Sequence, residues 1–346
     1  MIVVIIAGGS GSRLWPLSTP DYPKHLLKIN GDDNSLLQNT YRRVKHLAEH
    51  VYVVSESSHI QYVREQLDEL SEANFIVEPG RRGTGNCIAL ALSIIQKRHA
   101  PEDVVAFVHA DHFIRDEAGF AYSFGVATAV SAQENKIVLV GVEPDHPATG
   151  FGYIEKGEML NSQTLAYSVQ SFKEKPDFQT AKRYLSSGKY LWNCGYFVGS
   201  TQTFKTAMEQ HASDLNQNFE KLVNLATADI TDTYLTFDNE AIDYALIEKV
   251  PDLLVVPAGF DWMDLGSFSD IAKASGGDEQ GNLTTGKVEL EEVQNSLVQN
   301  TEDKPLAVIG LDNIVVVNTP DGILVARKDL SQKVGDVSKR FNAQTP

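Results

Sequence analysis

Short apolar runs rich in valine and isoleucine recur along the N-terminal part of this chain, and they constrain its fold more than any other feature. Each run has the length of a buried strand, and an amphipathic stretch with helical spacing separates it from the next. The runs are Ile2 to Ile6, Val51 to Val54, Phe75 to Val77, Val104 to Val108 and Ile137 to Val140. This alternation is typical of a parallel sheet with helices on both faces. The sequence therefore predicts an α/β domain.

The alternation loosens after Gly150, and the composition changes again near residue 276. Strand, turn and helix candidates are mixed up to Ala274, so we expect an insertion that packs on the same sheet. A polar, glycine-rich linker, Gly276 to Asn282, then precedes closely spaced strands and a helical tail from Leu330. These strands are Leu306 to Leu311, Ile314 to Val317 and Ile323 to Ala326. We predict two domains, residues 1–275 and residues 276–346, the second small, β-rich and used for packing or subunit contact.

Composition excludes several classes of function. The chain has 346 residues, 42% of them hydrophobic, and can bury a sizeable core. Its net charge of −16 repels nucleic acids and anionic membranes, so an anionic substrate needs a local basic site with a metal ion. No apolar segment reaches the roughly 18 residues of a membrane-spanning helix, and we expect a cytoplasmic protein. Cys87 and Cys194 form no C-x-x-C pair and are expected to be core side chains.

A glycine-rich segment follows the first apolar run, at the carboxyl end of a predicted strand where ligands usually bind. It reads "IIAGGSGSRLWPLS", Ile5 to Ser18, and "PKHLL", Pro23 to Leu27, follows after a short gap. It is not a dinucleotide fingerprint, because Leu14 stands where the third glycine belongs, and it lacks the Gly-Lys-Ser or Gly-Lys-Thr end of a P-loop. Its backbone N–H groups can still face an anion, with Arg13 and Lys24 as separate cationic groups.

Two segments far apart in the sequence offer carboxylates for a metal ion. Asp111 in "HADHF" directly follows a predicted strand, where an acidic residue is well placed to bind Mg²⁺. Asp264 in "FDWMDLGSF" stands at another strand-to-helix turn, and Asp261 either competes for the same role or orients the loop. His112 is either a supporting group or a polar residue at the loop edge.

Three further motifs carry groups that suit a phosphorylated sugar: "TGFGYI", "FKEKPD" and "LWNCGYF". Gly150 and Gly152 let the backbone approach a ligand closely. Glu174 can accept hydrogen bonds from sugar hydroxyls, and Lys175 can pair with a phosphate. Asn193 can donate and accept at once. Each residue is ordinary by itself, and their occurrence together indicates a site.

In this order the motifs resemble those of the sugar-1-phosphate nucleotidylyltransferases, and within them the mannose-1-phosphate guanylyltransferases. "AIDYALIE", Ala241 to Glu248, adds a match, and the resemblance runs from Ile2 to about Lys273. It implies an α/β, Rossmann-like nucleotidyltransferase domain with a mixed, mainly parallel sheet. The remainder resembles the small C-terminal, left-handed β-helix-like domain with a terminal helix of members that have the guanylyltransferase activity alone, so no isomerase activity is expected.

The resemblance implies transfer of GMP from GTP to α-D-mannose 1-phosphate, with release of pyrophosphate. Asp111 and Asp264 would hold Mg²⁺. Arg13 would stabilise the departing pyrophosphate, and Lys24 would bind phosphate near the reacting centre. Other residues implied to contact the nucleotide are Ala7, Gly8, Gly9, Gly11, Ser12, Glu78 and Thr84. Those implied to hold the sugar phosphate are Gly150, Gly152, Glu174, Lys175 and Asn193. A homodimer is expected.

One segment departs from the family pattern. Where the family usually has Asn-Thr-Ala-Pro, this chain reads Gly83-Thr84-Gly85-Asn86, and only Thr84 is kept. We expect guanine to be preferred with weaker discrimination against ATP, and Asn86 to supply the missing amide.

Other functions stay open at this point. One alternative keeps the chemistry and changes the sugar 1-phosphate or the nucleotide. Another is a catalytically silent regulatory homologue, which would tend to have lost the metal aspartates or the cationic groups that this chain keeps. A glycosyltransferase is disfavoured because no Asp-x-Asp follows Val104 to Val108.

Overall fold

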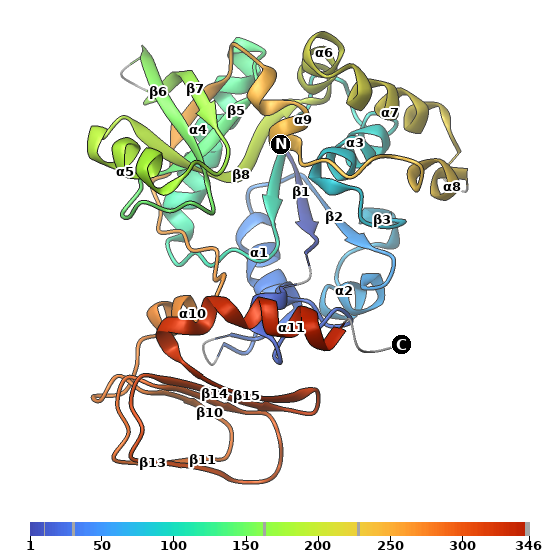
Figure 1. Cartoon of the computed structure of the whole chain (residues 1–346). Coiled ribbons are helices and arrows are strands. Elements are labelled where there is room, and N and C mark those ends of the chain that lie inside the picture. Colours follow the sequence, from blue (N-terminus) through green and yellow to red (C-terminus); the bar gives the residue numbers. More distant parts are fainter. Residues whose placement is uncertain (10, 30–31, 162–163, 227–228, 343–346) are drawn as a thin grey trace.

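The structure, a computed structural model, describes residues 1–9, 11–29, 32–161, 164–226 and 229–342. The larger domain is built around one mixed sheet with the strand order β3-β2-β1-β4-β8-β5-β9-β7-β6 (Figure 1). Its strands are β1 (Ile2–Ala7), β2 (His50–Glu56), β3 (Phe75–Glu78), β4 (Val104–His109), β5 (Val138–Val142), β6 (Gly152–Asn161), β7 (Ala166–Lys173), β8 (Tyr190–Ser200) and β9 (Leu254–Pro257). Each apolar run of the N-terminal part forms a strand, as predicted.

The sheet divides into a parallel and a largely antiparallel part. Strands β3, β2, β1 and β4 are parallel, as are β5 and β9. Strand β8 lies antiparallel between β4 and β5, and β6 and β7 extend the far edge. The predicted mixed sheet is confirmed. Its antiparallel part is larger than expected, because the insertion after Gly150 supplies three strands that fold back onto the sheet.

Helices cover both faces of the sheet. They are α1 (Leu36–Val44), α2 (Ile60–Gln66), α3 (Gly83–Ile95), α4 (Glu117–Glu134), α5 (Phe178–Ser187), α6 (Thr201–His211), α7 (Ser213–Asn224), α8 (Ile230–Tyr234) and α9 (Ile242–Ala245). Successive side chains of a strand point to opposite faces. Ile2, Val4 and Ile6 therefore pack in the core with α3, α6 and α7, whereas Val3 and Ile5 pack with α1, α2 and α4.

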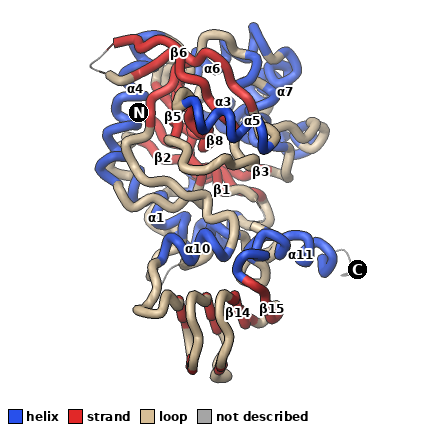
Figure 2. The backbone as a smooth tube through the Cα atoms, turned by 60° about the vertical axis from the view of Figure 1, so that its left-hand side comes forward, coloured by secondary structure: helices blue, strands red, loops and turns tan. Residues whose placement is uncertain are grey.

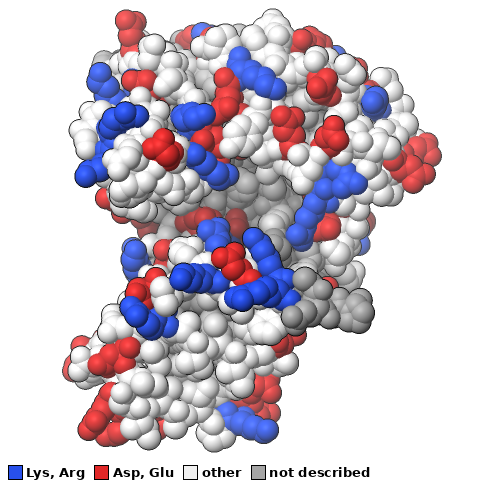
Figure 3. Space-filling model, viewed as in Figure 1, with Lys and Arg blue, Asp and Glu red and all other residues white. Residues whose placement is uncertain are grey.

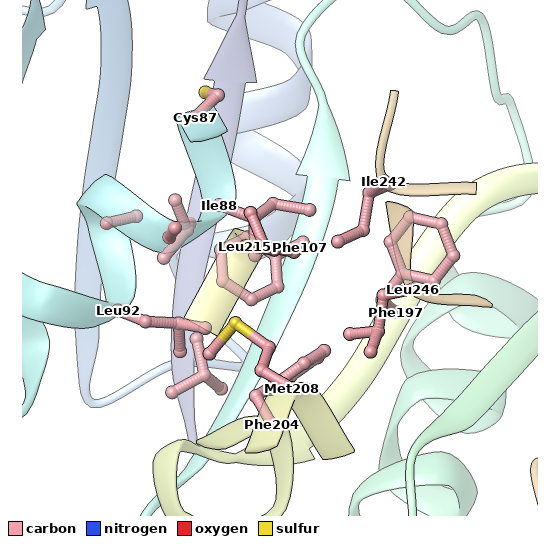
Figure 4. Close-up of a cluster of buried hydrophobic side chains, with 14 of the residues drawn as sticks. Cys87, Ile88, Leu92, Phe107, Phe197, Phe204, Met208, Leu215, Ile242 and Leu246 are labelled. Atoms are coloured by element: carbon pink, nitrogen blue, oxygen red, sulfur yellow. The ribbon is translucent and has the colours of Figure 1, made fainter. Parts of the chain in front are cut away.

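Figure 4 shows part of the first of these cores, where helix and strand side chains interdigitate. Ile88 and Leu92 of α3 lie beside Phe107 of β4, and Phe204 and Met208 of α6 close the cluster. The two cysteines are buried free thiols, in agreement with the prediction. Within the described residues, none of the helices combines the length and the apolar character needed to cross a bilayer.

The C-terminal part forms stacked short strands. They are β10 (Leu283–Thr285), β11 (Val288–Glu291), β12 (Leu297–Asn300), β13 (Leu306–Ile309), β14 (Ile314–Thr319) and β15 (Gly322–Arg327). Parallel pairs β10–β12, β12–β14 and β11–β13 place successive strands in register, as in a β-helix. A 3-10 helix, η6 (Lys328–Lys333), leads into the terminal helix α11 (Val334–Asn342). Helices α10 (Phe268–Ser275) and α11 lie between these strands and the larger sheet in both views (Figures 1 and 2).

The two parts of the molecule share a hydrophobic core. Leu14, Leu265 and Phe268 of the larger domain are buried together with Val315 and Val317 of β14. The predicted boundary after residue 275 coincides with the end of α10, and the packing continues across it. The C-terminal part therefore touches the glycine-rich segment, whose Leu14 belongs to this core.

Candidate active site

The glycine-rich segment folds over Lys24 at the carboxyl end of β1. Gly11 adopts φ +59°, and a Cβ at this position would lie 2.6 Å from Cβ of Lys24, so no side chain fits there. The Ser18 hydroxyl donates to the Gly11 carbonyl at 2.5 Å and fixes the loop. Gly8 and Gly9 face open space, whereas Lys24 is buried, with its side chain 7% exposed. The loop thus presents backbone above a buried ammonium group.

Lys24 joins the two predicted metal aspartates. Its Nζ lies 2.7 Å from Oδ2 of Asp111, at the end of β4, and 3.3 Å from Oδ1 of Asp264, in the loop between β9 and α10. It also donates to the Asp264 carbonyl at 2.5 Å. Three segments far apart in the sequence therefore meet at one point, because β1, β4 and the loop after β9 end at the same edge of the sheet.

Charge pairing dominates the electrostatics of this cluster. Burial acts to raise the pKa of the Asp111 carboxyl, but the Lys24 ammonium, with His112 and His109, holds that pKa well below its usual range. Burial likewise acts to lower the pKa of Lys24, and the carboxylates of Asp111 and Asp264 raise it above its usual value. The pair is charged at neutral pH.

Arg13 approaches the same cluster from the solvent side. Its Nη2 lies 3.8 Å from Oδ2 of Asp264, and its side chain is 53% exposed. Together with Gly150 these residues line a cavity of about 530 Å³ that also reaches Lys273 of α10 and Gln332 of η6. The guanidinium forms no hydrogen bond within the described part of the protein, so its donors can bind a ligand.

The donor set at the cluster suits a hard divalent cation. Asp111 and Asp264 already share one cation, the Lys24 ammonium, at distances of 2.7 and 3.3 Å. Among the described residues no group of three or more His, Cys, Asp or Glu side chains is arranged as a metal site. Two carboxylates without further protein ligands match Mg²⁺, which usually takes its other ligands from water and substrate phosphates.

The other predicted aspartate and histidine have supporting contacts. The Asp261 carboxylate accepts hydrogen bonds from the backbone N–H groups of Arg115 and Asp116, at 2.9 and 2.8 Å, and pairs with the Arg115 guanidinium. Asp261 therefore orients the loop, one of the two readings that the sequence left open. Nδ1 of His112 lies 2.8 Å from the Tyr196 hydroxyl, inside the core. His112 thus supports the strand end that carries Asp111.

Four of the five predicted sugar-phosphate residues gather in a second cluster. Gly152 of β6 pairs with Asn193 of β8, and a Cβ on Gly152 would lie 2.4 Å from Oε2 of Glu174. Oε1 of Glu174 pairs with Nζ of Lys175 at 2.9 Å, whereas Oε2 is buried and has no hydrogen-bond partner among the described residues. A buried oxygen is costly to leave unpaired, so this atom is a candidate acceptor for a donor that a ligand brings. Gly150 lies apart, in the cavity beside Arg13.

The sequence interpretation gave no role to Asp243, although it lies in the quoted motif "AIDYALIE". The Asn193 amide donates to Oδ1 of Asp243 at 2.7 Å. Burial, followed by the Glu174 carboxylate, raises the pKa of Asp243 to about 6. In the same motif Glu248 accepts the backbone N–H of Glu174 at 3.0 Å. The motif was the one sequence signal that pointed to Asp243. No spacing rule predicts that residue 243 lies near residues 174 and 193.

The two clusters are connected along β8. The Gly195 backbone N–H donates to Oδ1 of Asn193 at 3.1 Å, and Gly195 lies against the ring of His109. His109 ends β4, two residues before Asp111. The cationic cluster and the Glu174 cluster are therefore linked through β8 and the end of β4.

Glu78 contacts α8, and Thr84 contacts the start of α9, the helix that carries Asp243. Oε1 of Glu78 accepts from the Tyr234 hydroxyl at 2.7 Å, and Oγ1 of Thr84 accepts from the backbone N–H of Ile242 at 2.9 Å. Ala7 ends β1, and Ser12 begins the 3-10 helix η1 (Ser12–Leu14) beside Arg13. Nucleotide contact by these four residues stays a prediction.

The prediction that Asn86 supplies a base-reading amide is wrong. Asn86 is buried, its Nδ2 donates to the carbonyls of Arg82 and Asp238 at 2.9 and 2.8 Å, and its Oδ1 accepts from Asn218 at 2.9 Å. The amide is therefore fully engaged within the protein. The backbone at position 83 requires glycine, because its φ is +78° and a Cβ there would lie 2.1 Å from the Glu240 carbonyl oxygen. This requirement accounts for the glycine at the start of the altered motif.

Comparison with known proteins agrees with this geometry. The family model for nucleotidyl transferases matches residues 2–281, and the model for the MannoseP isomerase/GMP-like β-helix domain matches residues 288–341. The mannose-1-phosphate guanylyltransferase of Klebsiella pneumoniae is 37% identical over 344 residues, which cover 96% of this chain and 72% of that protein. The chain belongs to the mannose-1-phosphate guanylyltransferase family of nucleotidyl transferases.

Two further relatives extend this assignment. The mannose-1-phosphate guanylyltransferase of Escherichia coli (strain K12) is 35% identical over 353 residues, covering 98% of this chain and 73% of that protein. A crystal structure from Thermus thermophilus, described as a mannose-1-phosphate geranyltransferase, has a TM-score of 0.88 at 26% identity, and the match covers 99% of each chain. The resemblance predicted from the motifs is thus confirmed, together with the guanylyltransferase family's two-part architecture.

Proposed function

We propose that this protein transfers GMP from GTP to α-D-mannose 1-phosphate, forming GDP-mannose and pyrophosphate. The observation that carries the proposal is the convergence of Lys24, Asp111 and Asp264, together with a second cluster in which one Glu174 oxygen is buried with no hydrogen-bond partner among the described residues. The first group suits phosphates and the second suits a sugar hydroxyl. The names of the curated relatives support the particular nucleotide and sugar.

The reaction needs positioning and charge neutralisation and no covalent nucleophile. A phosphate oxygen of the sugar phosphate attacks the α-phosphorus of GTP in line, the bond to the β-phosphate oxygen breaks, and pyrophosphate leaves. Lys24 neutralises charge at the reacting phosphate, and Arg13 neutralises charge on the leaving group. Glu174 and Asn193 orient the mannose through its hydroxyls, while Lys175 binds its phosphate. Asp243 adds a carboxyl group beside Asn193.

Asp111 and Asp264 are the residues that would hold Mg²⁺. When bound, the ion would neutralise phosphate charge and polarise the phosphorus. We expect turnover to stop in excess chelator and to return on adding Mg²⁺.

A substrate panel tests the proposal. The purified protein is incubated with each of four nucleoside triphosphates and several sugar 1-phosphates, and pyrophosphate release is measured. We expect the highest kcat/KM for GTP with mannose 1-phosphate. A different preferred pair would establish the alternative in which the chemistry is kept and the substrates differ. Absence of release for every pair, from a folded protein that binds GTP, would establish the silent homologue.

The remaining expectations concern assembly and location. We propose a homodimer, supported by exposed apolar side chains on the C-terminal part, namely Ile309, Ile323 and Val325. Light scattering should give twice the mass of the chain, and a monomer at micromolar concentration would contradict it. We also propose that the protein acts in the cytoplasm, and cell fractionation tests this.

A further inference from the structure

Two glycines from separate segments, Gly266 and Gly335, lie against the Arg13 side chain. A Cβ on Gly266, in the loop that carries Asp264, would lie 3.2 Å from Nη1 and 3.3 Å from Cζ of Arg13. A Cβ on Gly335, in α11, would lie 2.9 Å from Cγ of Arg13 and 3.7 Å from its Cα. Gly266 thus borders the guanidinium, and Gly335 borders the aliphatic stem. The C-terminal helix contacts the arginine directly.

Other contacts fix α11 against this segment. The Trp15 ring stacks on Phe341 with a centroid separation of 5.1 Å and an interplanar angle of 29°. Val334 of α11 is buried in the core that also contains Leu14. The two residues that follow Arg13 are therefore anchored to the same helix. The helix cannot move away from Arg13 without breaking these contacts.

The guanidinium end is less constrained than the stem. It is half-exposed, and its ion pair with Asp264 is long, at 3.8 Å. Lys and Arg side chains gather on the lower rim of the hollow between the two parts of the molecule, near α10 and α11 (Figure 3). The position of the Arg13 Cγ atom sets the direction of the aliphatic stem. It therefore decides where the guanidinium lies within the hollow.

We propose that Gly335 is a positioning residue for Arg13, which makes the C-terminal helix a working part of the transfer site. The proposal rests on the role given to Arg13 under "Proposed function". A side chain at position 335 would displace the stem at Cγ, and the shift would grow toward the guanidinium. Misplacement of a catalytic group by about 1 Å can cost up to about 100-fold in rate. The predicted use of the C-terminal domain for packing or subunit contact is thereby extended to the chemistry.

The test compares Gly335→Ala with a matched glycine in a helix. Gly125 in α4 is exposed, and a Cβ there would meet nothing within 4 Å, so Gly125→Ala is the control. Thermal melting verifies that each variant is folded. We expect Gly335→Ala to lower kcat about tenfold, with little change in KM for mannose 1-phosphate. Gly125→Ala should keep the wild-type kcat, and Gly335→Val should lose more than Gly335→Ala.

A double-mutant cycle separates positioning from general damage. In an Arg13→Ala background, Gly335→Ala should cause no further loss, because the side chain it displaces is gone. The proposal would be overturned if Gly335→Ala lowered kcat by the same tenfold in the wild-type and in the Arg13→Ala background. It would also be overturned if Gly335→Ala kept the wild-type kcat while Arg13→Ala had a reduced kcat. A wild-type kcat for Arg13→Ala itself would overturn the role of Arg13 in the proposed function, and this inference with it.

Discussion

At the scale of single residues, two neighbouring aspartates differ in what they contact. Asp264 faces Lys24 and Arg13, whereas Asp261 is held by Arg115 and backbone N–H groups. We predict that Asp264→Asn lowers kcat more than 100-fold without unfolding the protein, because a carboxylate at the phosphate site is lost. Asp261→Asn is the matched control and should retain kcat within a few-fold while lowering Tm. Steady-state kinetics and thermal melting measure both, and equal activities for the two variants would contradict the assignment.

Asp243 gives a prediction about pH. Its folded-state pKa of about 6 lies above the unfolded value, near 4, so the folded protein binds this proton more tightly. The stability contributed by protonated Asp243 is complete below about pH 4 and is lost as the pH rises through 6. Asp243→Asn should therefore raise the free energy of unfolding at pH 8 by about 2 kcal/mol, with no gain at pH 4. Urea unfolding at both pH values measures this, and a gain of the same size at pH 4 would refute it.

At the scale of elements, Asn86 ties the first turn of α3 to the segment before α9. Removing its amide leaves the carbonyls of Arg82 and Asp238 without that donor. We predict that Asn86→Ala destabilises the protein by about 2–4 kcal/mol, since several buried hydrogen bonds are lost. The ratio of kcat/KM for GTP and ATP should stay unchanged.

Asn224→Ala, at an exposed helix end, is the control and should leave Tm within about 1 °C. A smaller ratio of kcat/KM for GTP to kcat/KM for ATP in Asn86→Ala would show that this residue does contribute to base recognition.

At the scale of the whole molecule, the shared core couples the two parts. Val317 of β14 is fully buried with Leu14 and Phe268, while Val77 of β3 is 38% exposed. We predict one cooperative unfolding transition, and a loss of about 2 kcal/mol for Val317→Ala, because its methyl groups fill a core common to both parts. Val77→Ala is the control and should change stability by less than about 1 kcal/mol. Calorimetry measures this, and two separate peaks would contradict the coupling.

The sequence by itself determined which N-terminal segments form the first strands, and it indicated candidate residues for the chemistry. The apolar runs predicted their strands because the local pattern of apolar residues is enough to indicate a buried strand. The residue types in the motifs around Arg13, Lys24, Asp111 and Asp264 were enough to indicate phosphate chemistry. Only the tertiary structure decided which of these side chains meet. Lys24 contacts Asp264 across 240 positions of sequence, and no spacing rule reaches that far.

Tertiary packing also decided the cases where pattern reasoning was incomplete or wrong. Asn86 was assigned to the nucleotide because of its position in a motif, but the segment before α9 folds over it and takes up its amide. Asp243 received no role, because its neighbours come from other segments, Asn193 from within β8 and Glu174 from the position after β7. Gly335 received no role from the sequence, because its contact with Arg13 exists only once α11 packs against the glycine-rich segment. Local sequence determines whether a segment forms a strand, a helix or a turn. Which segments become neighbours depends on tertiary packing, because apolar surface is removed from water only when distant segments meet.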